Sequence, residues 1–361
     1  MTETAWLLPL SGVGVGIVMG FVARRYHFCT LGAFERCWYA GDSTRLRSWV
    51  LVALVAAMLT QLAQFFGFVD GSRTFYATHP LNLLGVTLGG LMFGIGMALV
   101  GTCGFGALIR LGGGSLRAAV ALTGIALSAL AAQRGITAQG RVAMTEPFDM
   151  VISTEHGSTL AGLLESFGLS ILTIPTMLVV FLTIGYWIFR DAGFRADRER
   201  IGVGLVLGIC VALGWLITSY FASIAFFPVQ LEAANFVGPV GDALFQIVVT
   251  TGAMPDYAVG LVMGVVLGAA VAAWTADDIR WEACDDAREL SRHIFGSFLM
   301  GTGGIMALGC TIGQVVSAAS VFALSAPLAF ASMALGARIG LSLLLEGSPL
   351  AFLRRSTQPA E

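Results

Sequence analysis

Long apolar segments alternate with short polar connections along the whole chain. A transmembrane helix needs about 20 predominantly apolar residues, and nine segments approach that length. They lie at residues 7–23, 49–69, 83–101, 116–132, 169–189, 201–221, 257–274, 294–309 and 321–345. This pattern predicts an all-α integral membrane protein with about nine transmembrane helices.

Two further apolar segments are too short to cross a bilayer and too apolar to be ordinary loops. They lie at residues 28–40 and 236–250. Non-helical backbone at membrane depth is tolerated only where protein surrounds it or where it lines a water-filled cavity. We therefore expect short re-entrant or broken helices between the spans.

One pattern of glycines around a cysteine occurs twice with identical spacing. Gly89, Gly94, Gly96, Cys103 and Gly106 match Gly296, Gly301, Gly303, Cys310 and Gly313. A weaker similarity joins residues 16–20 to residues 204–208. The two cysteine blocks would run in opposite directions through the membrane, which predicts an inverted repeat of four spans, a linker span and four spans, as in many secondary transporters. The alternative is that the glycines only let helices pack closely.

This repeat divides a single transmembrane domain, residues 1–361, into four parts. We expect a first repeat at 7–133, an extracytoplasmic segment and linker span at 134–200, a second repeat at 201–345 and a cytoplasmic tail at 346–361. Arginines cluster after the first span, after the fifth span and near the end of the chain. By the positive-inside rule these clusters lie in the cytoplasm, so we expect the amino terminus outside and the carboxyl terminus inside a bacterial inner membrane.

The composition agrees with lipid as the surroundings and excludes several functions. Hydrophobic residues make up 57% of the chain and charged residues 12%, compared with about 25% charged in soluble domains. A net charge of −2 does not favour nucleic-acid binding, which needs a basic patch. A phosphate-binding GxxxxGK[ST] motif does not occur in the sequence, which disfavours direct use of ATP. We predict no cofactor, no metal site and no catalytic residue.

Three of the six cysteines share a local frame. Cys29, Cys103 and Cys310 each end an apolar run and are followed three residues later by Gly32, Gly106 and Gly313. A helix that breaks and restarts there presents free backbone N–H groups, which form an anion site. The thiol adds a soft, weakly donating group. We predict that these six residues, with Thr311 and Gln314 of the last block, bind a small sulfur-containing anion.

The remaining cysteines lack this frame. Cys37, Cys210 and Cys284 are interpreted as small buried hydrophobes. The chain has no CxxC pair, which disfavours a zinc ribbon, a thioredoxin-like site or a disulfide framework.

Four charged or titratable residues are candidates for a gate or mouth. Arg25 and His27 come just before Cys29, where they would attract an anion or set the topology. Glu155 and His156 lie in the longest extracytoplasmic segment, where a structural cap or a gate is the expected role.

At these residues the sequence resembles the YeeE/YedE family of thiosulfate transporters. The resemblance rests on residues 25–29, 94–106, 155–156, 165–167 and 301–313, and it extends over nearly the whole chain. It implies nine spans with short helices dipping in from both faces, and uptake of thiosulfate that Cys29, Cys103 and Cys310 relay through S–H···S contacts. It also implies cytoplasmic partners of the TusA or rhodanese type.

Other functions stay open at this point. A transporter for a soft metal, selenium or another chalcogen compound would also use cysteines. A membrane thiol oxidoreductase would need a close pair of cysteines, and no such pair stands in the sequence. A sensor that binds the anion without moving it would have the same site.

Overall fold

The computed structural model describes residues 2–152, 154–225, 228–249 and 255–348, and it is almost entirely helical. Every predicted span overlaps one long helix. The long helices are α1 (Thr2–Arg25), α3 (Thr44–Phe65), α5 (Leu83–Val100), α7 (Leu116–Arg134), α10 (Thr173–Phe189), α12 (Arg198–Ile224), α14 (Tyr257–Thr275), α15 (Ala287–Met306) and α16 (Ser325–Glu346). The prediction of an all-α, multi-pass membrane protein is confirmed.

Within the described residues, eight helices are long and apolar enough to cross a membrane. The long helix that does not meet both conditions is α15, which contains the predicted span at 294–309. Its first turns carry Arg288, Glu289 and Arg292. One side of its apolar part packs against α5 and α7, while Ile294, Phe295 and Phe298 are exposed.

Short helices connect the long ones. They are α2 (Thr30–Tyr39), α4 (Phe75–Thr78), α6 (Gly104–Gly112), α8 (Ile136–Thr145), α9 (Leu160–Ser166), α11 (Ala192–Ala196) and α13 (Gly238–Val248). The short 3-10 turns are η1 (Gly71–Arg73), η2 (Glu146–Phe148) and η3 (Ser170–Leu172), and η4 (Gly313–Ala318) is π-helical. The strands β1 (Leu81–Asn82) and β2 (Asp149–Met150) pair antiparallel. The predicted short apolar segments 28–40 and 236–250 contain α2 and α13.

The long helices pack in pairs through glycines. α1 packs against α14, α3 against α12, α5 against α15 and α16, and α7 against α15. An ideal Cβ added at Gly16 would lie 2.4 Å from the Leu261 carbonyl oxygen, and one added at Gly94 would lie 2.2 Å from that of Met333. Backbones therefore approach closely at these positions, as small residues permit in membrane helices.

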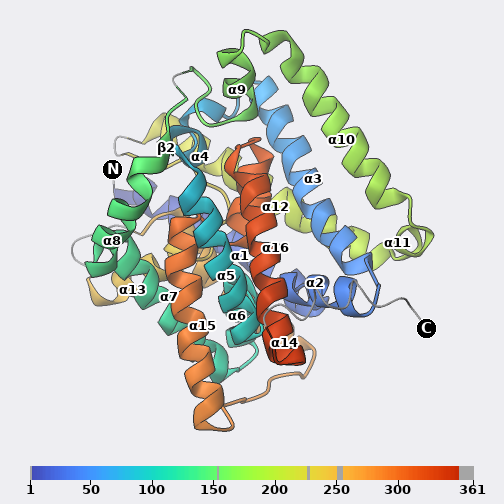
Figure 1. Cartoon of the computed structure of the whole chain (residues 1–361), viewed down its shortest axis with the longest axis vertical. Coiled ribbons are helices and arrows are strands. Elements are labelled where there is room, and N and C mark those ends of the chain that lie inside the picture. The colour runs from blue at the N-terminus through green and yellow to red at the C-terminus, as the bar shows by residue number, and fades with distance from the viewer. Residues whose placement is uncertain (1, 153, 226–227, 250–254, 349–361) are drawn as a thin grey trace.

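The paired helices run in defined relative directions. Glycine contacts place Gly12 near Tyr257 and Gly20 near Val265, so α1 and α14 are parallel. α5 and α15 are antiparallel, because Gly89 contacts Gly303 and Gly96 contacts Gly296. In Figure 1 most of the long helices run between the upper and lower ends of the molecule, and α10 lies at its edge beside α3.

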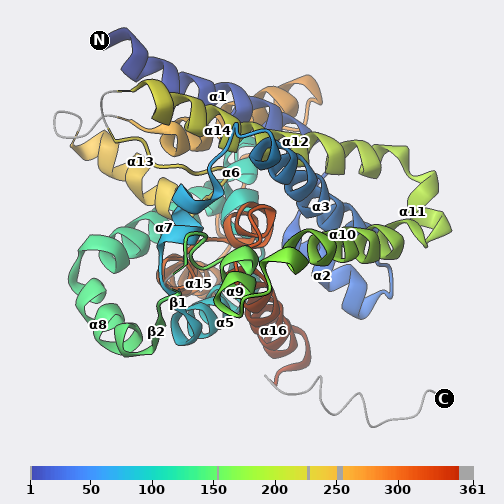
Figure 2. The same cartoon turned by 90° about the horizontal axis from the view of Figure 1, so that it is seen from above.

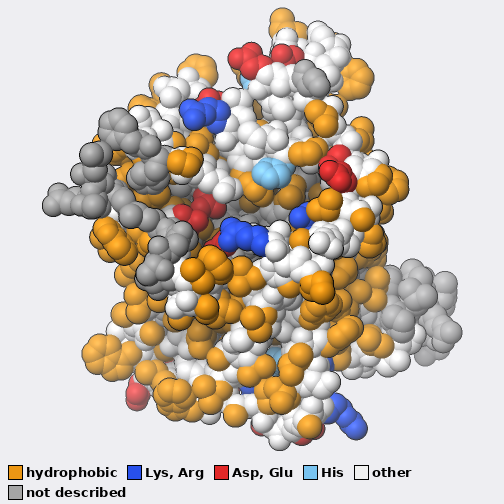
Figure 3. Space-filling model, turned by 90° about the vertical axis from the view of Figure 1, so that its left-hand side faces the viewer, with side chains coloured by type: hydrophobic (Ala, Val, Ile, Leu, Met, Phe, Trp, Pro, Cys, Tyr) orange, Lys and Arg blue, Asp and Glu red, His pale blue; other side chains and the backbone are white. Residues whose placement is uncertain are grey.

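The short helix α6 lies near the centre of the bundle in the view from above (Figure 2). One face of the molecule is largely hydrophobic in its lower half, and charged side chains of both signs gather in its upper half (Figure 3). The short helix α6 is therefore central, whereas α2, α8, α11 and α13 lie toward the periphery in the same view.

Candidate functional site

Two of the three framed cysteines are the N-cap residues of short helices. Cys29 is the N-cap residue of α2, where its side chain makes no capping hydrogen bond, and Cys103 is the N-cap residue of the central helix α6. The Sγ atom of Cys103 accepts a hydrogen bond from the Gly106 backbone N–H at 3.4 Å. A thiol thus takes the position at which an oxygen of Ser, Thr, Asn or Asp usually caps a helix.

Cys310 directly precedes the helical residues 311–312 that lead into η4. Its Sγ atom accepts a hydrogen bond from the Gly313 backbone N–H at 3.3 Å. The preceding Gly309 has a φ of +156°, a conformation that favours glycine. The backbone N–H of Cys310 in turn donates to Asn235 Oδ1 at 3.4 Å. The equal spacing of cysteine and glycine in the sequence therefore produces equal caps in the structure.

Thr30 brings these caps into one cluster. Its Oγ1 atom lies 3.7 Å from Cys103 Sγ and 3.4 Å from Thr311 Oγ1. It also accepts a hydrogen bond from Trp49 Nε1 at 3.1 Å. Cys103, Cys310, Thr30 and Thr311 are all at most 2% exposed. We call these four residues the central cluster.

Cys29 lies beside the central cluster but lines two adjoining cavities of about 270 Å³ each. Both cavities also contain His27, Phe28 and Arg45. The charged residues that line one or both are Arg24, Arg25, Glu35, Arg45, Arg110, Asp197, Glu199 and Arg200. We call them the basic cavities. Of the predicted mouth residues, Arg25 lines one and His27 lines both.

A cavity of about 310 Å³ lies on the other side of the central cluster. Tyr76 and Asn235 line it near Cys310, and its charged residues are Arg134, Glu232, Asp242 and Asp256. We call it the acidic cavity. Arg134 forms an ion pair with Asp242 at 3.4 Å. Burial raises the pKa of Glu232 well above its usual range, and the nearby Asp256 and Asp242 raise it further.

The predicted extracytoplasmic gate residues lie outside these cavities. His156 Nδ1 is 3.0 Å from Glu165 Oε2, and both Glu155 and His156 are exposed to solvent. Neither residue lines the acidic cavity, and their gate role stays a prediction.

Gln314 is buried, and both polar atoms of its side-chain amide are hydrogen-bonded. Its Nε2 atom donates to the Ala307 carbonyl oxygen at 2.6 Å, and its Oε1 atom accepts from Ser325 Oγ at 3.1 Å. These contacts hold η4 against the end of α15 and the start of α16. Binding of substrate by Gln314 stays a prediction.

Sequence reasoning missed Thr30, Arg45, Asn235 and Glu232. Thr30 directly follows Cys29, as Thr311 follows Cys310. A comparison of the residues that follow each framed cysteine would therefore have found Thr30. Arg45 belongs to the arginine cluster after the first span, from which we predict only the topology. Asn235 and Glu232 stand in a loop segment whose position depends on distant contacts.

The thiols are not paired with one another. All six cysteines, each within the described part of the chain, are free. Among the described residues, no group of three or more His, Cys, Asp or Glu side chains is arranged to hold a metal ion. The site therefore offers thiol groups, hydroxyl groups and helix N-termini between the basic cavities and the acidic cavity.

Comparison with known proteins identifies the family of this chain. The thiosulfate transporter TsuA of Escherichia coli K12 is 27% identical over 327 residues, covering 84% of this chain and 86% of that protein. The thiosulfate transporter TsuA of Spirochaeta thermophila is 27% identical over 337 residues, covering 90% and 96%. Both relatives are named as transporters, which agrees with the prediction that this chain is not an enzyme. Because a family model described as sulphur transport matches residues 25–339, the chain belongs to the sulphur transport family, the YeeE/YedE family that its motifs resemble.

Proposed function

We propose that this protein takes up thiosulfate by passing it between the thiols of Cys310, Cys103 and Cys29. The observation that carries the proposal is the central cluster, in which two cysteine caps meet through Thr30 and Thr311 between cavities at opposite ends. The transporters to which the chain is similar are named for thiosulfate. Each thiol would donate a weak S–H···S hydrogen bond to the terminal sulfur, and no covalent intermediate forms.

The proposal includes an inverted repeat, with α1, α3, α5 and α7 equivalent to α12, α14, α15 and α16. Under this equivalence the pair α1 and α14 corresponds to the pair α12 and α3, and both pairs are observed. The contact of Gly89 with Gly303 likewise corresponds to that of Gly296 with Gly96. This agreement supports a two-fold relation in which Cys103 and Cys310 are equivalent.

We further propose that the protein lies in the bacterial inner membrane with the basic cavities toward the cytoplasm. Arg24, Arg25, Arg45 and Arg200 lie at that end, which agrees with the positive-inside rule. The acidic cavity is then extracytoplasmic, the amino terminus lies outside and the carboxyl terminus lies inside. A TusA-like or rhodanese-type sulfur carrier would receive the anion on the cytoplasmic side.

Growth on thiosulfate tests this function. In cells that lack other uptake routes and have thiosulfate as the sole sulfur source, Cys103→Ala and Cys310→Ala abolish growth, because each removes an S–H donor from the route. Cys37→Ala is the matched control, since Cys37 lies on α2 outside the glycine frame and is only half-buried. Growth of this control equals that of the unmodified protein.

Normal growth of both variants at normal membrane abundance contradicts the relay. Competition assays with sulfate, sulfite and selenium oxyanions then identify the substrate. If only a selenium compound or a soft metal competes, thiosulfate is not the substrate.

A further inference from the structure

Arg45 differs from Arg24, Arg110 and Arg200 in its partners, and from the exposed Arg25 in being half-buried. Arg24 forms an ion pair with Asp278 at 2.9 Å, and Arg200 forms one with Asp197 at 2.6 Å. Arg110 donates a hydrogen bond to the Gly101 carbonyl oxygen. Arg45 is half-buried, and within the described residues it makes no direct hydrogen bond or ion pair of its own. A guanidinium that is partly removed from water without a partner is costly, and an anion would stabilise it.

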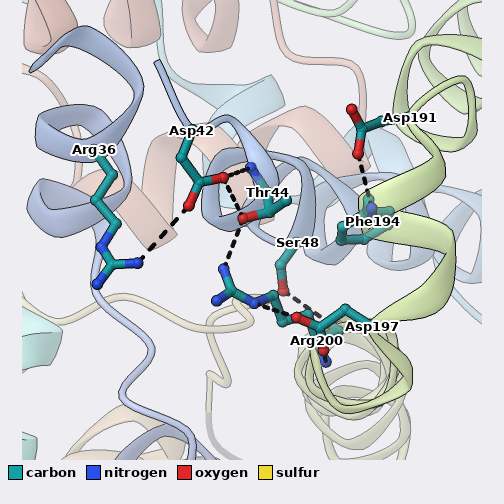
Figure 4. A network of polar contacts seen from close by, with 8 residues as sticks. All are labelled: Arg36, Asp42, Thr44, Ser48, Asp191, Phe194, Asp197 and Arg200. Atoms are coloured by element: carbon teal, nitrogen blue, oxygen red, sulfur yellow. Dashed lines mark hydrogen bonds and ion pairs between the residues drawn. The ribbon is translucent and has the colours of Figure 1, made fainter. Parts of the chain in front are cut away.

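A network of polar contacts lies at the start of α3, next to Arg45 in the chain (Figure 4). Asp42 accepts hydrogen bonds from the Thr44 hydroxyl and backbone, and Arg200 Nη1 donates to Thr44 Oγ1 at 3.0 Å. Arg36 lies 3.7 Å from Asp42. These contacts fix the start of α3 against α2 and α12. They therefore hold the backbone of Arg45 in place while its side chain stays available.

The Arg45 side chain points to the same place as the Cys29 thiol. An ideal Cβ added at Gly32 would lie 3.6 Å from Arg45 Nη1 and 3.9 Å from Cys29 Sγ. The guanidinium and the thiol thus flank one glycine, and both line the two basic cavities. A side chain at Gly32 would therefore touch both groups, which shows that the guanidinium and the thiol lie close to one point.

We propose that Arg45 and Cys29 form one binding site for a small oxyanion with a terminal sulfur. Arg45 binds the sulfonate oxygens through charge-assisted hydrogen bonds, while the Cys29 thiol faces the terminal sulfur. The site is the last station before the cytoplasm. This assignment rests on the proposed function, which names the transported anion.

A pair of charged thiol reagents tests the site without requiring transport. Sulfonatoethyl methanethiosulfonate is an anion and its trimethylammonium analogue is a cation, and both transfer their thioalkyl group to a cysteine with release of methanesulfinate. The rate of Cys29 modification by each is measured on the full chain by peptide mass spectrometry. The ratio of the two rates cancels any change in the intrinsic reactivity of the thiol.

Arg45→Gln lowers the ratio of anionic to cationic rates at least about threefold, because the positive charge beside Cys29 is lost. Arg195→Gln is the matched control, since Arg195 is an exposed residue of α11 that lies outside the basic cavities. Its ratio stays at the wild-type value. An unchanged ratio in Arg45→Gln, or an equal fall in Arg195→Gln, overturns the assignment.

Uptake kinetics provide the second measurement. Arg45→Gln raises the KM for thiosulfate about tenfold or more, and Arg45→Lys restores part of the loss because it keeps the charge without the fork of donors. Absence of thiosulfate uptake by the unmodified protein contradicts the proposed function but leaves the reagent ratio as a test of Arg45. Normal uptake with an unchanged KM in Arg45→Gln contradicts the site alone.

Discussion

At the residue scale, Thr30 connects the parts of the candidate route. Its hydroxyl contacts Cys103 and Thr311 and accepts from Trp49 Nε1. Because it lies next to Cys29 in the chain, one residue links α2 to both of the other cysteine caps. A hydroxyl can donate to one neighbour and accept from others, so Thr30 can reorient its proton as an anion passes.

We expect Thr30→Val to lower thiosulfate uptake about tenfold with the fold retained. Valine has the shape of threonine but leaves the Trp49 N–H without an acceptor, which costs about 1–3 kcal/mol. Initial uptake rates and membrane abundance are measured together. Thr60→Val is the control, because Thr60 is also fully buried and its hydroxyl has no hydrogen-bond partner within the described residues. Equal rates in both variants would show that the Thr30 hydroxyl has no part in transport.

At the element scale, close packing of glycine-rich helices sets the positions of the short helices. α1 and α14 approach so closely that Gly12, Gly16 and Gly20 each face backbone atoms of the partner helix. α2 follows α1 directly, so this pair also determines where Cys29 lies. Gly14, on the same helix, has no atom within 4 Å of its ideal Cβ position.

We therefore expect Gly16→Val to lower the thermal stability of the purified protein in detergent, while Gly14→Val leaves it unchanged. Overpacking typically costs about 1–3 kcal/mol, and a Cβ 2.4 Å from the Leu261 oxygen cannot be accommodated without moving a helix. Size-exclusion chromatography after heating measures the loss of monodisperse protein. Equal midpoints for the two variants contradict this account of the α1–α14 interface.

The helices could be predicted from the sequence, but their meeting at one point could not. Hydrophobicity is a local property, so the nine long helices and the short α2 and α13 were found from windows of residues. The contact of Thr30 with Thr311 joins residues 281 positions apart, and it depends on how the helix pairs pack. The same reason explains why Arg45 and Glu232 were not recognised, whereas the cysteines were recognised from a repeated spacing.

At the scale of the whole molecule, the cavities at the two ends have opposite character. The acidic cavity contains three carboxyl groups and Arg134, although the proposed substrate is an anion. The raised pKa of Glu232, caused chiefly by burial, removes part of this conflict. A neutral carboxyl group does not repel the substrate, and it can donate a hydrogen bond to it.

We expect uptake to fall as pH rises through the raised pKa of Glu232. Below its raised pKa Glu232 is neutral, and above that pKa its carboxylate adds negative charge where the anion enters. Proteoliposomes with the same pH on both sides give the initial rates. Glu232→Gln flattens the profile, and Glu155→Gln, an exposed loop variant outside the cavity, retains it. A profile that rises with pH contradicts this role of Glu232.

The central cluster has a consequence for the cell as well as for the substrate. Its four side chains are at most 2% exposed, so within the described part of the chain they close the route between the basic cavities and the acidic cavity. In the inner membrane proposed above, such a closed route would let many copies of the protein be present without dissipating the proton gradient. A transported ion must lose its hydration shell at the central cluster, and a large, polarizable sulfur atom loses water more readily than an oxygen atom does.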